Sequence, residues 1–445
     1  MPDDGWTTLP FDQAVLVNPS VRLELGKIYP FVDMQAVDPG SRSVGPSEER
    51  PFKGGGSRFV HGDTLMARIT PCLENGKIAR YAAPEGEGAG HGSTEFIVIR
   101  GRPNVTDNGF AFYLTKWDGV RQYCISQMTG SSGRQRVPTG ALSHREVTIP
   151  PLKEQQAIAC ILGALDDKIE LNRTMNRTLE EMARAIFKSW FVDFDPVRAK
   201  AVGQQPHGLK PEVAALFPDT FEPSELGEIP KGWSVTSLAD QITAGKGLSY
   251  KGQHLCAEGE GLPMHNLNSV YEGGGYKHEG LKWYNGEYRP AHLLKPGDVI
   301  VTNTEQGFDY LLIGYSAIVP ERYGPQGLFS HHIFRIRPKS TSYLPAWFTY
   351  LLLRTQRFHD LVAGHSNGTT VNMLPLDGLQ KPKFVLPPEA LVKRFEVLFV
   401  PAHQRIEQIH DENASLAALR DTLLPKLISG ELAVAEAERI AGRCA

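Results

Sequence analysis

The stretch from Ile149 to Phe194 most constrains what this chain can fold into, because it predicts one very long helix. The pair Pro150-Pro151 stops whatever precedes it, since proline lacks a backbone donor and pushes the residue before it out of the helical region. No proline interrupts Lys153 to Phe191, and a helix of that span is about 58 Å long. Seam residues follow at alternating spacings of four and three: Ile158, Leu162, Leu165, Ile169, Asn172, Asn176, Leu179, Ala183, Ile186 and Trp190. A helix with one such seam needs a partner helix.

A second stretch of the same kind supplies that partner. It opens with Pro387-Pro388, which lies 237 residues after the first Pro-Pro pair. The same offset carries the seam onto mostly apolar residues: Phe395, Phe399, Ala402, Ile406, Ile409, Asn413, Leu416, Arg420, Leu423 and Leu427. Asn176 falls on Asn413, and a polar seam residue is tolerated mainly where it fixes register, so we expect these two side chains to pair. Pro401 predicts a kink or break in the second helix. The alternative is two unrelated amphipathic helices of one core.

The segments outside the two helices also repeat. Residues 1–150 predict short strands and glycine-rich loops, with strands at TLMARI and EFIVIR, helical spacing over 109–128 and a polar loop at 129–137. Residues 227–387 echo this order at offsets from 227 to 237: SHHIFRIR stands where STEFIVIR stood, and a second polar loop follows at 363–372. Residues 195–226 are rich in proline and predict a connector with one helical turn at VAALF.

The chain is therefore predicted to be a tandem duplication of a globular domain plus a long helix. The fold class is α+β, with two α/β domains related by a pseudo-twofold and separated by two long helices. We expect six segments, namely a first domain at 1–150, a long helix at 151–194, a connector at 195–226, a second domain at 227–387, a second helix at 388–430 and a tail at 431–445.

Composition excludes several classes of protein. The 445 residues are 41% hydrophobic and 22% charged, and no apolar run approaches the ~20 residues of a membrane helix. Five scattered cysteines without zinc spacing predict a cytoplasmic protein with no structural metal. The net charge of −3 is a weak argument against binding nucleic acid, but arginine-rich loops within a neutral domain are compatible with reading DNA.

No catalytic motif stands out in the sequence. It lacks a Walker A motif, His-Glu-x-x-His, Gly-x-Ser-x-Gly and the Asn-Pro-Pro-aromatic tetrad of amino-methyltransferases. The adjacent pair His331-His332 is predicted to point to opposite faces of a strand, which argues against a shared metal ion. We therefore expect a binding protein rather than an enzyme, without a cofactor of its own.

Three stretches carry a resemblance to a known family. IPPLKEQQAIACILGALDDKIELNRTMNRTLEEMARAIFKSWFVDFDPVRAK, the following LGEIPKGW and the C-terminal LRDTLLPKLISGEL resemble the specificity subunit of type I restriction-modification systems. The resemblance covers essentially the whole chain, and Pro401 is a departure from it.

That resemblance implies a function and a set of partners. Each globular domain would be a target recognition domain that reads one half of a split, asymmetric sequence in double-stranded DNA. The long helices would pack as an antiparallel coiled coil and fix the spacing between the halves, while the subunit itself stays catalytically silent. Two modification subunits that bind S-adenosylmethionine would methylate adenine, and restriction subunits would supply the cleavage that depends on ATP and Mg²⁺.

Within this scheme the polar loops are the first candidates for DNA contact, because Arg, Asn and Gln can bind base edges and hydroxyls can bind bases or phosphates. They are Ser131, Ser132, Arg134, Gln135 and Arg136 in the first domain and His365, Ser366, Asn367, Thr369, Thr370 and Asn372 in the second. Phosphate contacts are predicted at Lys53, Arg58, Lys246, Tyr250 and Lys251, and at Asn303, Thr304 and Gln306. The competing interpretations are ordinary solvated loops, an enzyme with an unrecognised site, and a scaffold whose domains bind protein.

Overall fold

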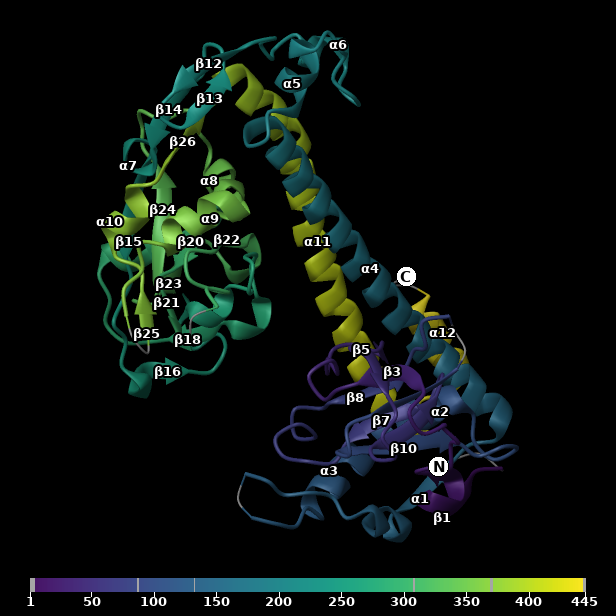
Figure 1. Cartoon of the computed structure of the whole chain (residues 1–445). Coiled ribbons are helices and arrows are strands. Elements are labelled where there is room, and N and C mark those ends of the chain that lie inside the picture. The colour runs from purple at the N-terminus through teal and green to yellow at the C-terminus, as the bar shows by residue number, and fades with distance from the viewer. Residues whose placement is uncertain (1–4, 86–87, 132, 307–308, 369–370, 443–445) are drawn as a thin grey trace. The chain divides into compact units, whose positions relative to one another are not determined.

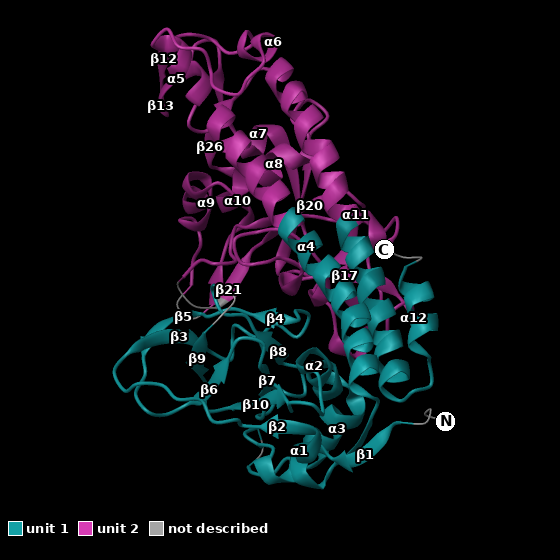
Figure 2. Cartoon of the chain, turned by 90° about the vertical axis from the view of Figure 1, so that its right-hand side faces the viewer, with its two compact units in different colours: residues 1–175, 409–445 teal, residues 176–408 magenta. Residues whose placement is uncertain are grey.

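The computed structural model describes residues 5–85, 88–131, 133–306, 309–368 and 371–442. Contacts divide the chain into two compact units, residues 1–175 with 409–445, and residues 176–408 (Figure 2). Each unit combines a mixed α/β domain with one half of each long helix. The α+β fold class predicted from the sequence is confirmed.

Both long helices form as predicted. Helix α4 spans Leu152–Phe191 and α11 spans Glu389–Ile428, each of 40 residues (Figure 1). Every predicted seam position on both helices is buried or half-buried. The break predicted at Pro401 does not occur. Pro401 is exposed, and the carbonyl that loses its helical partner belongs to Val397, which is 62% exposed, so water can satisfy it.

The helix halves within each unit run antiparallel. In the first unit, Asn172 Nδ2 donates to Asn413 Oδ1 at 2.9 Å, and Arg420 Nη1 lies 2.7 Å from Asp166 Oδ1. In the second, Asn176 Nδ2 donates to the carbonyl of Ile406 at 3.4 Å. The predicted Asn176–Asn413 pair is therefore wrong. In an antiparallel pair the residue numbers on one helix fall as those on the other rise, so repeat-equivalent positions do not face each other except at one crossing point.

The domain of the first unit contains two main sheets. One has the order β2-β10-β7-β8-β4 and the other β5-β3-β9-β6, while β1 pairs with β11. Their bounds are β1 Thr7–Pro10, β2 Val15–Val17, β3 Ile28–Val32, β4 Ser43–Val44, β5 Glu48–Pro51, β6 Ser57–Val60, β7 Thr64–Ala67, β8 Ile78–Tyr81, β9 Ala89–Gly92, β10 Phe96–Gly101 and β11 Glu146–Ile149. The helices are α1 Phe11–Ala14, α2 Asn108–Lys116, α3 Asp118–Ser126, the 3₁₀ turn η1 Thr139–His144 and α12 Val434–Ala441.

The domain of the second unit repeats this plan. Its sheets have the orders β15-β24-β20-β22 and β16-β18-β17-β23-β19, β14 pairs with β26, and β21 pairs with β25. The strands are β14 Ser234–Ser237, β15 Ile242–Lys246, β16 Leu255–Cys256, β17 Leu262–His265, β18 Lys282–Tyr284, β19 Leu293–Leu294, β20 Val299–Thr302, β21 Thr304–Gln306, β22 Ser316–Ile318, β23 Gly327–Phe329, β24 Ile333–Pro338, β25 Val371–Met373 and β26 Lys383–Leu386. The helices are α7 Leu238–Gln241, α8 Ala346–Leu353, α9 Gln356–Ala363 and α10 Leu376–Gln380, with 3₁₀ turns η2 Gly252–His254, η3 Leu267–Ser269, η4 His278–Gly280, η5 Pro290–His292 and η6 Glu321–Tyr323.

The internal duplication is visible in the strand pairing. β10 lies between β2 and β7 in the first unit, and β24 lies between β15 and β20 in the second, antiparallel in each case. In the smaller sheets, β3 pairs in parallel with β9 as β17 does with β23. The connector after α4 forms α5 Asp195–Ala201, the predicted helical turn α6 Pro211–Ala214, and the hairpin of β12 Phe221–Ser224 with β13 Gly227–Pro230.

A buried tyrosine ties each domain to its pair of long-helix segments. Tyr113 of α2 donates to Asp166 Oδ2 at 2.7 Å, and the same carboxylate pairs with Arg420. Tyr350, which stands 237 residues after Tyr113, donates to Glu180 of α4 at 3.2 Å. Burial and the neighbouring carboxylate raise the pKa of both phenols, which therefore stay neutral and serve as donors. Around these ties lie the largest cores of each unit.

Among the helices that the structure describes, none is long and apolar enough to cross a membrane.

The buried Asp166–Arg420 pair generates a stability prediction. The variant Asp166→Asn should lower the free energy of unfolding by about 1–3 kcal/mol, because it removes the buried carboxylate partner of Arg420 and leaves only the exposed Asp421, 2.8 Å from Nη2. Adding Arg420→Met should recover most of that loss, since no charge then remains unpaired. Asp167→Asn is the matched control: its side chain is 66% exposed, so a loss of about 0–1 kcal/mol is expected. Equal losses in denaturant unfolding for Asp166→Asn and Asp167→Asn would contradict this account.

His265 generates a pH prediction. It is 1% exposed at the end of β17, and burial lowers its pKa to about 3, against ~6.5 in the unfolded chain. As the pH falls, His265 is protonated in the unfolded chain before it is protonated in the folded one. Its contribution to the free energy of unfolding is therefore complete above pH ~6.5 and decreases by about 1.4 kcal/mol per pH unit toward pH 3. His265→Gln should flatten the stability profile between pH 6 and 4 by that slope, and the exposed His207→Gln should not. A profile unchanged by His265→Gln would contradict the assignment.

Candidate nucleic-acid interface

A buried ion pair fixes the strand from which each candidate site is built. The side chain of Asp63, directly before β7, accepts a hydrogen bond from the backbone N–H of Val60 at 2.7 Å. It accepts two more from the guanidinium of Arg100, at 2.6 and 2.7 Å. Asp298, before β20, repeats these contacts with the backbone at 2.9 Å and with Arg337 at 2.6 Å twice. These bonds raise the pKa of Arg100 and Arg337. This Asp–Arg pair was not predicted from the sequence, although the aspartate and the arginine both recur in the second domain at a nearly constant offset.

The first polar loop forms a closed hairpin. The backbones of Thr129 and Arg136 exchange two hydrogen bonds of 2.8 and 3.0 Å. The loop is docked onto the segment that follows β7, where the Arg68 carbonyl accepts the Val137 N–H at 2.8 Å. Ser131 and Arg134 are exposed and Gln135 is half-buried. Ser132 lies outside the described residues. The loop therefore offers its side chains from a fixed backbone rather than from a free one.

Arg136 already has a partner within the domain. Its Nε lies 2.9 and 3.0 Å from the two carboxylate oxygens of Glu95, and its Nη2 lies 2.7 Å from Oε1. Both residues are partly exposed, at 44% for Arg136 and 23% for Glu95. Glu95 thus compensates the positive charge of Arg136 and orients its guanidinium group.

The second polar loop docks in the same way. Backbones of Asn367 and Met373 exchange two hydrogen bonds of 2.8 and 2.9 Å, and the Leu374 N–H donates to the carbonyl of Asn303 at 2.8 Å. His365 and Asn367 are exposed, and the half-buried Ser366 bonds its own helix end at 2.7 Å. Thr369 and Thr370 lie outside the described residues. Asn372, in β25, is only 2% exposed, so we omit it from the proposed contacts below.

Asn303 and Thr304, which follow β20, are too buried to contact a DNA phosphate. Asn303 and Thr304 are each 4% exposed, and Asn303 Nδ2 donates to the carbonyl of His331 at 3.0 Å. The backbone of Gln306 ends β21, and its side chain lies outside what the structure describes. Asn303 and Thr304 therefore support the second loop rather than present a charged or polar surface.

The His331-His332 pair differs from our prediction. Both residues lie in the turn before β24 rather than on opposite faces of a strand, and their ring centroids are 3.8 Å apart. His332 is linked to Thr304 Oγ1 through Nδ1 at 3.0 Å. Burial, and then the charges of His331 and Lys282, lower the pKa of His332, so it acts as a neutral hydrogen-bonding group at pH 7. Within the described ranges, no three His, Cys, Asp or Glu side chains are grouped to hold a metal ion.

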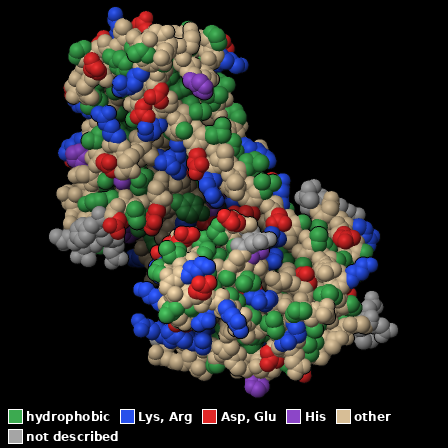
Figure 3. Space-filling view, turned by 45° about the vertical axis from the view of Figure 1, so that its right-hand side comes forward, with side chains coloured by type: hydrophobic (Ala, Val, Ile, Leu, Met, Phe, Trp, Pro, Cys, Tyr) green, Lys and Arg blue, Asp and Glu red, His purple; other side chains and the backbone are tan. Residues whose placement is uncertain are grey.

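The predicted phosphate contacts divide between the two domains. Lys53 is exposed after β5, and Arg58 in β6 stacks on an aromatic ring and lines the same cleft as Arg68. In the second domain, Lys246 is exposed at the end of β15, and Lys251 is exposed as well. Tyr250 accepts a bond from Lys282 Nζ at 3.1 Å. On the face drawn in Figure 3, basic side chains are interspersed with acidic ones.

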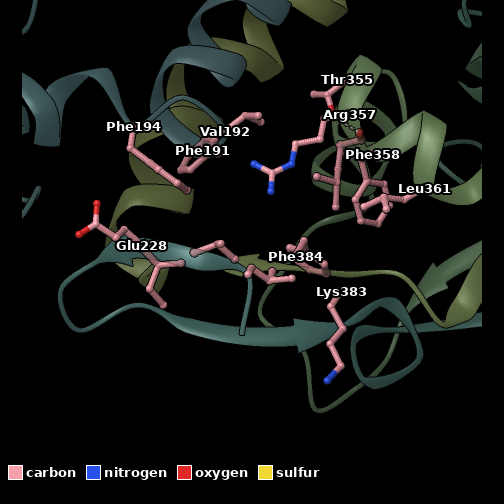
Figure 4. A pocket seen from close by; sticks show the side chains of 14 residues that line it. Phe191, Val192, Phe194, Glu228, Thr355, Arg357, Phe358, Leu361, Lys383 and Phe384 are labelled. Atoms are coloured by element: carbon pink, nitrogen blue, oxygen red, sulfur yellow. Dashed lines mark hydrogen bonds between the residues drawn. The ribbon is translucent and has the colours of Figure 1, made fainter. Parts of the chain in front are cut away.

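An apolar pocket of different character lies in the second unit. The end of α4, the α8–α9 junction, β13 and β26 line it, and Phe191, Phe194, Phe358 and Phe384 contribute aromatic rings (Figure 4). The guanidinium of Arg357 points into this pocket (Figure 4). Such a lining suits an apolar segment of a protein partner better than a DNA strand.

Comparison with known proteins gives consistent matches. Residues 75–181 match the model of the type I restriction modification DNA specificity domain. The HindI specificity subunit of Haemophilus influenzae is 27% identical over 394 residues, covering 76% of this chain and 81% of that protein. The MjaIX specificity subunit of Methanocaldococcus jannaschii is 24% identical over 370 residues, covering 77% and 76%. A crystal structure of a type I restriction-modification S subunit from M. genitalium shares the fold, with a TM-score of 0.50 and 14% identity over 96% and 97% of the two chains.

The Glu95–Arg136 pair generates a binding prediction. Glu95→Gln should release Arg136 for phosphate contact, so duplex DNA should bind more tightly, and the slope of log K against log salt should steepen by up to about 0.9. The matched control is Glu48→Gln, which frees Arg50 from a similar exposed pair of 2.5 Å on β5 outside the loop. Fluorescence anisotropy at several salt concentrations measures both quantities. Weaker binding or an unchanged slope for Glu95→Gln would contradict the prediction.

Proposed function

We propose that this chain, which belongs to the DNA specificity subunits of type I restriction-modification systems, reads a bipartite, asymmetric DNA sequence with one recognition domain for each half-site. One observation carries the proposal: the same framework holds two different polar loops. An Asp–Arg pair, a short strand and a docked hairpin recur in both domains, while the side chains that the loops present differ. A constant scaffold with variable loops is what two different base readouts require.

The side chains on these loops have the chemistry of base recognition. Arg134 and Gln135 would serve the first half-site, and His365 and Asn367 the second. Arginine pairs with guanine O6 and N7, and glutamine or asparagine pairs with adenine N6 and N7. Ser131 and Ser366 would add contacts to bases or phosphates, and Lys53, Lys246 and Lys251 would hold the backbone. Ser132, Thr369 and Thr370 remain proposed contacts from the sequence alone.

The long helices would dock the catalytic partners. Exposed apolar side chains remain on their outer faces after the seam is filled, namely Leu171 and Met175 in the first unit and Met182, Val397 and Leu398 in the second. Modification subunits, which we expect in two copies, would cover such positions and bring S-adenosylmethionine to an adenine of each half-site. Restriction subunits would add the cleavage that depends on ATP and Mg²⁺. This chain would then supply sequence selection and perform no chemistry itself.

Adenine methylation mapping tests the proposal. DNA from cells that express this chain with its cognate modification subunit should carry one split motif, methylated once in each half. Replacing residues 131–136 with a Gly/Ser linker should lose or change one half only, because each base contact contributes about 1–3 kcal/mol of discrimination. The same replacement of 365–370 is the matched control and should affect the other half. A stable complex that methylates no DNA would favour a protein-binding scaffold instead.

A further inference from the structure

The cleft that Arg58 and Arg68 line lies in the first unit, beside the docked loop. It has a volume of about 490 Å³ and is lined by Asn18, Ser20, Ser57, Arg58, Arg68 and Thr94, with backbone and apolar groups beneath. Two arginines line it, and none of its described lining residues is Asp or Glu. The cleft is therefore suited to an anion.

Arg68 is the least satisfied polar group of this cleft. It follows β7 directly, and its backbone is held on both sides: its N–H donates to the carbonyl of Glu95 at 2.9 Å and its carbonyl accepts from Val137. Its Nε is buried and has no hydrogen-bond partner, and no described acid forms an ion pair with it. No described residue accepts a hydrogen bond from the Arg68 side chain, so the guanidinium keeps N–H donors for a ligand oxygen in the cleft that it lines.

Arg58 is preorganised on the same cleft. Its guanidinium lies 4.8 Å from the centre of the Phe52 ring, and its Nη2 donates to the carbonyl of Gly54 at 3.1 Å. These two contacts fix the plane of the Arg58 guanidinium and leave its other N–H donors available. A guanidinium that is already held in place loses less conformational entropy when it binds a ligand.

Two neutral polar side chains of the cleft, Ser57 and Asn18, are engaged within the domain. Ser57 Oγ lies 2.9 Å from the carbonyls of both Ser93 and Phe96, and Asn18 Oδ1 accepts the Val98 N–H at 2.9 Å. The two guanidinium groups are therefore the donors with capacity to spare. Their charge and geometry match an oxyanion with several acceptor oxygens.

We propose that this arginine cleft, defined by Arg58 and Arg68, binds a backbone phosphate of the DNA strand whose bases the 129–137 loop reads. The inference rests on the proposed function and adds to it a phosphate-binding site that sets the position of the first domain on the duplex. Phosphate is favoured over a base edge because two uncompensated cations line one open cleft, whereas a bidentate base contact needs a single fork.

The second domain differs at the corresponding position. Where Arg68 follows β7, Asn303 follows β20, and Asn303 is buried and donates to a backbone carbonyl. Asn303 carries no charge. The arginine cleft is therefore a property of the first domain, although the two domains share the framework that surrounds it.

Salt-dependent DNA binding by the full chain with its modification subunit tests the inference. Arg68→Gln and Arg58→Gln should each lower the slope of log K against log salt by about 0.9, and should weaken binding to the mapped target and to a scrambled duplex by the same factor. Arg68→Lys should keep the slope, because the charge remains. Arg121→Gln is the matched control: this arginine lies on α3, pairs with Asp118 at 2.7 Å and lines a different cleft, so its slope should stay that of the wild type.

Other outcomes would overturn the inference. An unchanged slope for folded Arg68→Gln and Arg58→Gln proteins would remove the phosphate site. An unchanged slope with lost discrimination at one base pair would make the cleft a base-reading site. Replacing single DNA phosphates with neutral methylphosphonates adds a second measurement. Replacing the phosphate that the cleft binds should weaken DNA binding by the wild type but not by Arg68→Gln or Arg58→Gln. If every replacement weakens binding by the variants as much as by the wild type, the cleft does not bind a phosphate. If the wild type itself binds no DNA, the proposed function fails as well, which separates the two cases.

Discussion

The apolar seam of α4 and α11 is the constraint on which the rest of this chain depends. Neither helix can expose ten seam positions to water, so each half of one helix must lie against a half of the other. Polar groups inside the seam then select the arrangement. The bonds from Asn172 to Asn413 and from Arg420 to Asp166 form across the two helices in this antiparallel register, and slipping the register would break both of them. Tyr113 and Tyr350 attach the domains to these helices, because the hydroxyl of each donates a hydrogen bond to a carboxylate of α4.

A fixed framework with exchangeable loops explains how a duplicated chain acquires two specificities. The Asp63–Arg100 and Asp298–Arg337 pairs are identical in chemistry and nearly identical in geometry. Each holds the strand whose following segment receives the polar hairpin. The exposed loop side chains, such as Ser131 and Arg134, can therefore change without loss of the scaffold, since backbone hydrogen bonds hold both hairpins and the added side-chain pair uses Arg136 and Glu95. The proposed reading of two half-sites requires this separation of stability from recognition.

Three arginines near the first loop illustrate how environment decides the role of one residue type. Arg100 is committed to a buried carboxylate and is structural. Arg136 is exposed but compensated by Glu95, so its fork is oriented and its net charge is masked. Arg68 has no acidic partner among the described residues and carries a buried, unpartnered Nε. Only the last two have donors to offer DNA, and only Arg68 offers an uncompensated charge. Residue identity in the sequence does not distinguish these three cases.

The sequence by itself determined the long helices, their seams and the tandem repeat, because these follow from periodicity, proline placement and repeat offset, which are local or one-dimensional properties. It did not determine which residues face each other. The Asn176–Asn413 pairing failed because repeat-equivalent residues meet only at the crossing point of antiparallel helices, and the break at Pro401 failed because an exposed carbonyl can bond to water instead. Asn372 is buried although its loop is polar, and the rings of His331 and His332 lie in contact because both residues are in a turn rather than a strand. The arginine cleft likewise brings Arg58 and Arg68 together with Asn18 and Thr94, which come from other parts of the sequence. Such contacts depend on distances in three dimensions, so only the tertiary structure decides them.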